Sequence, residues 1–338
     1  MIETAPSTVV GVVTAGVVLA SLSGYWLLSR RRGRENGAAA ESSTASDADS
    51  GSARLPFLDR ADESDRRTID PQILLPVAAG DEHTLRLATV ACALKHRYGD
   101  EPLRLLSIDG ETDDDRDRPP IDDRIAERGI ATNTAILTET VETDDVTAAV
   151  VRAAPESNTD LLVTEWDLEA DGTTDRGAGE KAVARTPLPV YQFRLSHPPS
   201  ELARLRLVLP QHIDHHEGFY EAVYNVKQLA AQLELPITVY VFERNVDHYR
   251  TLFDLVEIDV LAEFRSVGSW DELGSTLEAR ADPADLLVTL AVREDEIGWD
   301  AELSTVAERF AALPPRSLAL CHLRADEPAY EDQFLRTS

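Results

Sequence analysis

Asp160-Leu-Leu-Val-Thr164 is the stretch that decides the fold, because it recurs letter for letter as Asp285-Leu-Leu-Val-Thr289. In each case an acidic residue opens a short, continuous apolar run, which is typical of a strand buried on both faces. An earlier strand repeats in the same order, since Ile73-Leu-Leu-Pro76 is matched by Leu207-Val-Leu-Pro210. The repetition predicts two copies of one arrangement of strands and helices.

Strands and amphipathic helices alternate through both copies. Copy one has expected strands near 72–78, 102–108, 134–139, 160–165 and 188–193, and expected helices near 83–98, 120–128, 143–156 and 177–186. Copy two has expected strands near 205–210, 236–242, 260–266, 285–290 and 316–323, and expected helices near 217–233, 246–256, 270–280 and 301–312. This alternation predicts an α/β fold made of two tandem, doubly wound, five-stranded parallel-sheet domains, at residues 69–196 and 201–325.

The first 30 residues carry the pattern of a membrane anchor. Thr8 to Ser29 contains no charged residue, and as a helix it would rise about 33 Å, enough to cross a hydrocarbon core of roughly 30 Å. Arginines follow at once at positions 30, 31, 32 and 34, whereas residues 1–7 contain neither Lys nor Arg. A cleaved signal peptide would carry its positive charges before the apolar run. We therefore expect one transmembrane helix at 8–29, in the cell membrane, with the N-terminus outside and the domains in the cytoplasm.

Two segments lack the composition of a folded core. Residues 30–68 are rich in Gly, Ala, Ser, Asp and Glu, and such a segment cannot bury enough apolar surface to fold. We expect a disordered acidic linker there and a short tail at 326–338.

The charge balance excludes one class of partner. The chain has 61 acidic and 33 basic residues, a net charge of −28. Nucleic-acid binding needs a basic surface, so no nucleic-acid partner is expected. A carboxylate-rich surface with few lysines stays hydrated when salt screens charge, and it is typical of proteins from a salt-loving archaeon.

Three strand motifs of copy one carry a family resemblance. They are the first strand Ile73–Val77, the fourth strand Asp160–Val163, and Pro187-Leu-Pro-Val190 at the fifth strand. Together they resemble the universal stress protein (UspA-like) family over about residues 70–324. The resemblance implies a regulatory role in the stress response and pairing of two copies through the fifth strand, which makes a homodimer a candidate assembly.

Copy two resembles a more specific member of that family. Glu217-Gly-Phe219, Trp270 and Ile297-Gly-Trp299 are similar to segments of the cytoplasmic C-terminal domain of cation/proton antiporters and related amino-acid permeases. The resemblance implies that the partner is a membrane transporter. A single span makes no transport pathway, so we expect a regulatory domain carried on its own anchor.

Many universal stress proteins bind ATP through an Asp after the first strand and a glycine series after the fourth. Here alanines follow the first strand, and the acidic loop after the fourth strand would repel a triphosphate. We therefore expect no cofactor, and an atypical nucleotide or small-ligand pocket in copy one is the alternative. The residues at this ligand edge are Ala78, Gly80, Gly172, Gly177 and Gly179.

The densest histidine group follows the first strand of copy two. It comprises His212, His215 and His216, with Asp214 and Glu217 nearby. Doubly wound folds place ligands at this carboxyl edge of the sheet. A metal site with nitrogen and oxygen ligands and a pH-responsive switch are therefore the two functional alternatives for this loop. Adjacent histidines in one loop rarely converge on one ion, and we expect an exposed polar loop without a metal.

Motifs of the common catalytic classes are missing from the sequence. There is no G-x-S-x-G elbow, Walker loop or H-E-x-x-H pair, each of which places a nucleophile, phosphate cradle or metal. The tryptophans at 166, 270 and 299 are expected to pack in the core. The missing motifs predict a non-enzymatic protein, and the apolar N-terminal stretch predicts a membrane anchor. The family resemblance adds the expectation of a regulatory protein that modulates a cation or amino-acid transporter.

Overall fold

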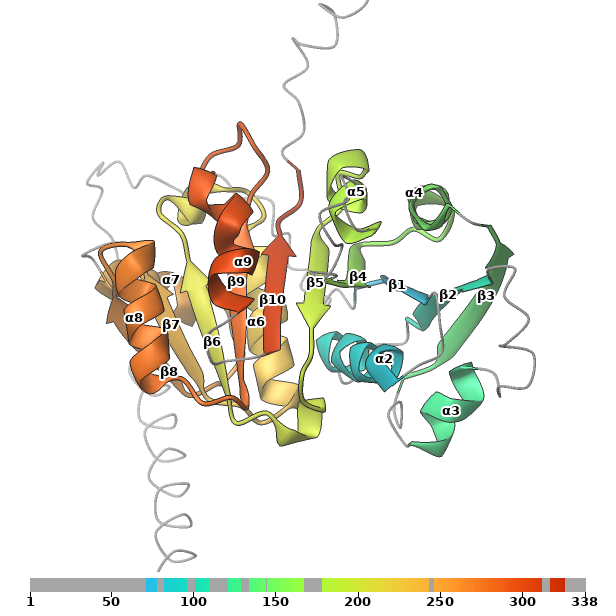
Figure 1. Cartoon of the computed structure of the whole chain (residues 1–338), viewed down its shortest axis with the longest axis horizontal. Coiled ribbons are helices and arrows are strands. Elements are labelled where there is room, and N and C mark those ends of the chain that lie inside the picture. Colours follow the sequence, from blue (N-terminus) through green and yellow to red (C-terminus); the bar gives the residue numbers. More distant parts are fainter. Residues whose placement is uncertain are drawn as a thin grey trace, which may run out of the picture. The chain divides into compact units, whose positions relative to one another are not determined.

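Ten strands form one sheet in the computed structural model, which describes residues 71–77, 82–95, 101–109, 121–128, 134–143, 145–166, 178–242, 246–311 and 317–325. The strand order is β3-β2-β1-β4-β5-β10-β9-β6-β7-β8 (Figure 1). All described residues lie in one compact unit, Asp62–Ser338. The strands are β1 Ile73–Val77, β2 Leu103–Asp109, β3 Ile136–Glu142, β4 Leu161–Glu165, β5 Val190–Arg194, β6 Arg204–Leu209, β7 Ile237–Val241, β8 Ala262–Ser266, β9 Asp285–Ala291 and β10 Ser317–His322.

The sheet consists of two halves with the same strand order. Within the first half (β1–β5) and within the second half (β6–β10), all neighbouring strands pair in parallel. The halves meet where β5 and β10 pair antiparallel, from Val190 opposite His322 to Arg194 opposite Leu318. The expectation of two separate sheets is therefore wrong. An unpaired edge strand leaves a row of open N–H and C=O groups, and the two fifth strands close each other's edge.

Helices and short 3-10 turns connect the strands. The α-helices are α2 Glu82–Leu94, α3 Ile121–Glu127, α4 Val146–Glu156, α5 Ala178–Arg185, α6 Phe219–Gln232, α7 Val246–Asp254, α8 Trp270–Arg280 and α9 Val306–Ala311. The 3-10 turns are η2 Pro199–Glu201, η3 Ile213–His215 and η4 Ala301–Thr305. Local signals start some of the helices: Ser269 caps α8 by accepting from the Glu272 N–H, and Asp145 caps α4 by accepting from the Ala148 N–H.

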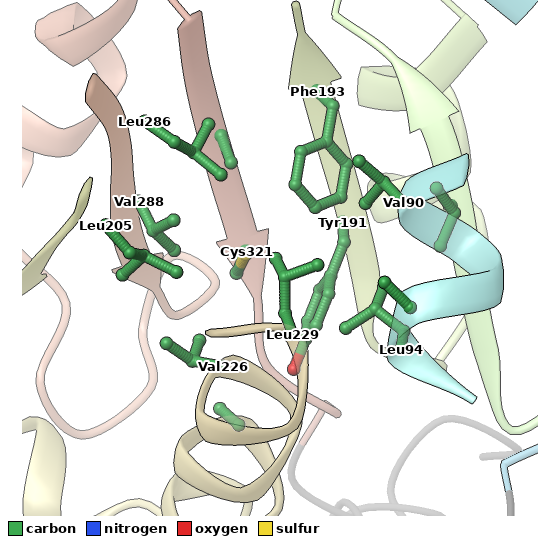
Figure 2. Packing of buried hydrophobic residues seen from close by; sticks show 14 of the residues in the cluster. Val90, Leu94, Tyr191, Phe193, Leu205, Val226, Leu229, Leu286, Val288 and Cys321 are labelled. Atoms are coloured by element: carbon green, nitrogen blue, oxygen red, sulfur yellow. The ribbon is translucent and has the colours of Figure 1, made fainter. Parts of the chain in front are cut away.

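One face of the sheet carries a continuous apolar core across both halves. Helix α2 of the first half packs against α6 of the second, and their side chains cover β5 and β10 together (Figure 2). Val90 and Leu94 come from α2, Val226 and Leu229 from α6, and Tyr191 projects between them. Polar contacts reinforce the joint, because Asn225 donates to the Tyr191 hydroxyl at 3.1 Å. The two halves are thus held together as one body on this face.

The opposite face is divided. Its apolar side chains form two clusters, one beneath α4 and α5 and the other beneath α8 and α9. The clusters do not merge over the junction of β5 and β10, which we call the seam. Trp166 and Trp270 are buried in the second of them, as expected, but Trp299 is 43% exposed, so the prediction of a core position was wrong for this residue.

Several predicted segments lie outside the described residues. These are the membrane helix at 8–29, the acidic linker at 30–68 and the tail at 326–338. Across the part of the chain that is described, no helix combines the length and apolar character needed to cross a bilayer.

Candidate functional site

At the carboxyl edge of the second half, where a doubly wound sheet offers a crevice, the loop after β6 contacts the loop after β9. The loop after β6 brings His216 against Glu296 in the loop after β9. The Gly218 N–H donates to His216 Nδ1 at 3.0 Å, which leaves the ring proton on Nε2, 3.3 Å from Glu296 Oε2. Glu296 Oε2 also accepts from the Arg293 N–H at 2.8 Å. His216 is buried and structural, in contrast to the exposed position expected for it.

A glycine allows these two loops to lie in contact. Gly298 has φ of +90°, and a Cβ at this position would lie 3.0 Å from Ile213 Cα and 3.2 Å from the His212 carbonyl oxygen. Only glycine adopts that conformation and approach without strain. The absence of a side chain at Gly298 therefore lets the loop after β9 pack directly against the loop after β6.

The remaining histidines do not converge. His212 and His215 are exposed, and their ring centroids are 6.1 Å apart. Asp214 accepts from His248 Nε2 at 3.0 Å and from the Tyr249 hydroxyl at 2.8 Å. Burial alone would raise the pKa of Asp214, but the hydrogen bonds from His248 and Tyr249 lower it. Among the described residues, no group of three or more His, Cys, Asp or Glu side chains is placed to hold a metal ion.

The ligand-edge residues of copy one are described only at Gly179. This glycine lies in α5, where a Cβ would overlap Gln192 Nε2 and come within 2.7 Å of Thr164 Oγ1. Its role in the structure is therefore close packing of α5 onto β4 and β5. Ala78, Gly80, Gly172 and Gly177 lie outside the described residues. The expectation of no cofactor there, and its alternative of an atypical nucleotide or small-ligand pocket, therefore stay predictions.

A cavity of about 790 Å³ lies over the seam, on the divided face of the sheet. We call it the seam cavity. Its first-half wall comes from the end of α5 and from β5, and its second-half wall comes from β10, the loop after β9 and η4. The lining residues are Trp166, Val183, Ala184, Arg185, Thr186, Pro187, Gln192, Val292, Arg293, Glu294, Trp299, Leu303, Leu320, His322 and Ala325.

Three buried polar atoms in this lining have no hydrogen-bond partner: Thr186 Oγ1, Gln192 Oε1 and His322 Nδ1. Gln192 is 2% exposed and Thr186 8% exposed. Register places Gln192 opposite Leu320 and Val190 opposite His322, so Gln192 and His322 come from adjacent strands. A buried polar group without a partner costs roughly 1–3 kcal/mol. Three cavity-lining residues that each hold such an atom make the seam cavity a candidate ligand site.

Arg293 gives the cavity a rigid side. Its guanidinium donates to the carbonyl oxygens of Val183 (3.2 Å), Thr186 (3.0 Å), Leu188 (2.8 Å) and Leu323 (2.6 Å). An arginine from the second half thus donates hydrogen bonds to carbonyl groups at and just after the C-terminal end of α5 in the first half, where a helix leaves its carbonyl groups without partners. Burial, reinforced by the Arg293 charge, lowers the pKa of His322 to about 4, so this imidazole is neutral at pH 7.

The sequence alone did not point to this site. Its polar residues come from α5, β5, the loop after β9 and β10, and they belong to no motif. Of the lining residues, Trp166 and Trp299 were expected in the core, and Pro187 was noted only as part of the fifth-strand motif. The usable signal was indirect: Gln192 and His322 are polar interruptions in strands that are otherwise apolar.

Comparison with known proteins shows a shared fold. No protein-family model matches the chain, and no curated protein matches it. The cytoplasmic domain of a prokaryotic cation chloride cotransporter superposes with a TM-score of 0.55 at 12% identity, covering 76% of this chain and 97% of that one. A functionally unknown protein from Pseudomonas aeruginosa PAO1 gives 0.52 at 10% identity, covering 76% and 94%. A universal stress protein from Archaeoglobus fulgidus DSM 4304 gives 0.48 at 13% identity, covering 76% and 98%. The first two likenesses establish the α/β fold and its mostly parallel sheet.

Proposed function

We propose that this chain is a non-enzymatic regulatory module that binds a small ligand in the seam cavity and acts on a membrane transporter. The observation that carries the proposal is that three residues lining one cavity, Thr186, Gln192 and His322, each have a buried polar atom without a hydrogen-bond partner. A cavity of about 790 Å³ falls within the range typical of small-molecule sites, roughly 300–1,000 Å³.

The position of the cavity supports regulation. A ligand there would contact α5 of the first half and the Arg293–Trp299 loop of the second, on the face where the two cores are separate. A ligand that binds only the folded state stabilises that state, and a ligand that contacts both halves stabilises their contact with each other. Occupancy of the cavity would therefore stiffen the joint between halves, which is a change that a bound partner can detect.

The lining favours binding over catalysis. Among its described residues there is neither a serine nor a cysteine to act as nucleophile. Its one histidine is neutral because burial lowers the pKa to about 4, and a general base works best when its pKa lies near the operating pH.

The transporter part of the proposal draws on likeness and on the N-terminus. The fold is shared with the cytoplasmic domain of a prokaryotic cation chloride cotransporter. The charge-free stretch at 8–29, followed by arginines, would hold this module at the cytoplasmic face of the cell membrane. Association of two copies is the alternative assembly.

Thermal-shift titration of the full-length chain tests ligand binding. The panel should contain ATP, other nucleotides, amino acids and polar metabolites, and a cavity ligand is expected to raise the melting temperature by several degrees at saturation. Thr186→Val and Gln192→Met remove an unpartnered polar atom with little change in volume. Each should leave the free protein at least as stable as before, because the unpartnered atom is removed, and should abolish the shift.

Thr251→Val is the matched control, because its hydroxyl donates to the Asp247 carbonyl on an exposed helix face. A panel without any hit, or a hit whose shift survives in both cavity variants, would refute the ligand site. Cross-linking of the full-length chain in its native membrane tests the proposed action on a transporter. Recovery of a polytopic transporter supports it, whereas recovery of cross-linked copies of this chain alone supports the homodimer.

A further inference from the structure

Arginines gather at the amino ends of the strands in the second half, at the sheet edge opposite the His216–Glu296 contact. They line a cavity of about 460 Å³, which we call the arginine cavity. Strands β6, β7, β8 and β9, the end of α8 and the turn that follows it all contribute. The lining residues are Ala203, Arg204, Arg206, Thr238, Glu263, Arg265, Arg280, Asp282 and Asp285.

Arg206 forms a fixed floor. It is 6% exposed and uses all three of its nitrogens, donating to Asp285 Oδ2 at 2.5 Å, the Tyr240 hydroxyl at 2.6 Å and the Arg280 carbonyl oxygen at 2.6 Å. Asp285 is 2% exposed, so this pair is internally neutralised. The charge that a ligand would meet comes from the other arginines.

Those arginines retain donor capacity. Arg204 Nη1 donates to Thr238 Oγ1 at 3.1 Å, and Arg265 Nη2 donates to Glu263 on its own strand at 2.6 Å. Within the described part of the chain, the Arg280 side chain makes no hydrogen bond or ion pair. Each guanidinium carries five N–H donors, so most of the donors on these three residues are uncommitted.

The balance of charged residues in this cavity is opposite to that of the whole chain. The protein has 61 acidic residues against 33 basic ones, yet four of the nine lining residues here are arginine and three are acidic. With Arg206 and Asp285 paired, three arginines face Glu263 and Asp282. Arginine forks match the oxygens of phosphate and carboxylate groups.

We propose that Arg204, Arg265 and Arg280 bind a phosphate group, free or at the end of a small soluble phosphomonoester. The three guanidiniums are carried by three different elements, β6, β8 and α8, and line one cavity. Donors from three elements suit a tetrahedral oxyanion with several oxygens better than a planar carboxylate. Glu263 competes with this ligand, because its carboxylate holds Arg265.

Isothermal titration calorimetry of the full-length chain with inorganic phosphate, glycerol 3-phosphate and acetate tests the proposal. Phosphate or its ester should bind, and acetate should bind at least tenfold more weakly. Tighter binding of inorganic phosphate assigns the free anion, and tighter binding of glycerol 3-phosphate assigns the ester. Arg280→Ala and Arg265→Ala should each weaken binding about tenfold, while Glu263→Gln should strengthen it severalfold.

Arg128→Ala controls for net charge, since Arg128 pairs with Glu82 on the exposed surface of the first half and its loss should leave phosphate affinity unchanged. Glu263 is 55% exposed, so Glu263→Gln should fold normally. Absence of phosphate and ester binding, equal weakening in Arg128→Ala, or weaker binding in Glu263→Gln would overturn the assignment.

Discussion

Arg206 Nε lies 2.5 Å from Asp285 Oδ2, and both side chains are almost completely buried. Asp285 also accepts from the Asp282 N–H at 2.9 Å. The first half has a related but weaker contact, in which Asp160 Oδ2 accepts from the Gln72 N–H at 3.0 Å. The repeated aspartate therefore fixes the start of a central strand in both halves, but only the second uses a buried ion pair.

Asp285→Asn should lower the free energy of unfolding by about 3 kcal/mol, because removing one partner of a buried pair leaves an uncompensated charge. Asp160→Asn should cost about 1 kcal/mol, since it only weakens one hydrogen bond. Urea unfolding of both variants measures the difference. Equal losses for Asp285→Asn and Asp160→Asn would contradict the ion pair's role.

Arg293→Ala should destabilise the joint between the halves. The substitution leaves the carbonyl groups of Val183, Thr186, Leu188 and Leu323 without their donor, which should cost about 3 kcal/mol. Arg293→Lys should recover only part of this, because an ammonium group cannot reach carbonyls in several directions.

Hydrogen exchange locates the effect of Arg293→Ala. Amides at the end of α5 and the start of β5 should exchange faster, whereas those of β7 should change little. Arg128→Ala, which removes an exposed arginine, should alter neither region. Uniform acceleration across both halves would mean that Arg293 acts on global stability alone.

Gly179→Ala should destabilise the protein by about 1–3 kcal/mol through overpacking. The new Cβ would overlap Gln192 Nε2 and approach Thr164 Oγ1. Shortening the neighbour in Gly179→Ala/Gln192→Ser should restore part of the loss. At Gly268 a Cβ meets only the flexible end of Glu272, at 3.0 Å, so Gly268→Ala is the matched control. Thermal unfolding of the four proteins tests this, and an equal effect at both glycines would contradict it.

Local pattern was enough to predict the elements. Asp160–Thr164 and Asp285–Thr289 lead into or form central strands, as expected from their apolar runs. The helix expected near 217–233 is present as α6, and its Phe219, Val223 and Val226 side chains are buried in the core. Such predictions succeed since the period of apolar residues is a property of one segment.

Contacts between distant segments could not be predicted in this way. The pairing of β5 with β10 joins the two halves into one sheet. This pairing depends on how two strands distant in sequence fit together, which the pattern of neither strand alone reveals. His216 meets Glu296 across 80 positions of sequence. The seam cavity exists because the cores on one face stay separate, and its polar atoms at Thr186, Gln192 and His322 belong to three different segments.

The pH dependence of stability should carry the signature of His322. Burial and the Arg293 charge lower the pKa of this side chain in the folded protein to about 4, against about 6.5 in the unfolded chain. Between these two values the unfolded state binds a proton that the folded state does not, so stability falls as pH decreases from 6.5 to 4. Above pH 6.5 the contribution is fully present, and below pH 4 no further loss arises from this group.

The full size of that loss is roughly 3 kcal/mol for a shift of this magnitude. His322→Asn cannot titrate, so its unfolding free energy should depend less steeply on pH than that of the unaltered protein across the window from 6.5 to 4. Carboxylates titrate alike in both proteins and cancel in the difference. Parallel pH profiles for His322→Asn and the unaltered chain would show that this imidazole is protonated as readily in the folded cavity as in water.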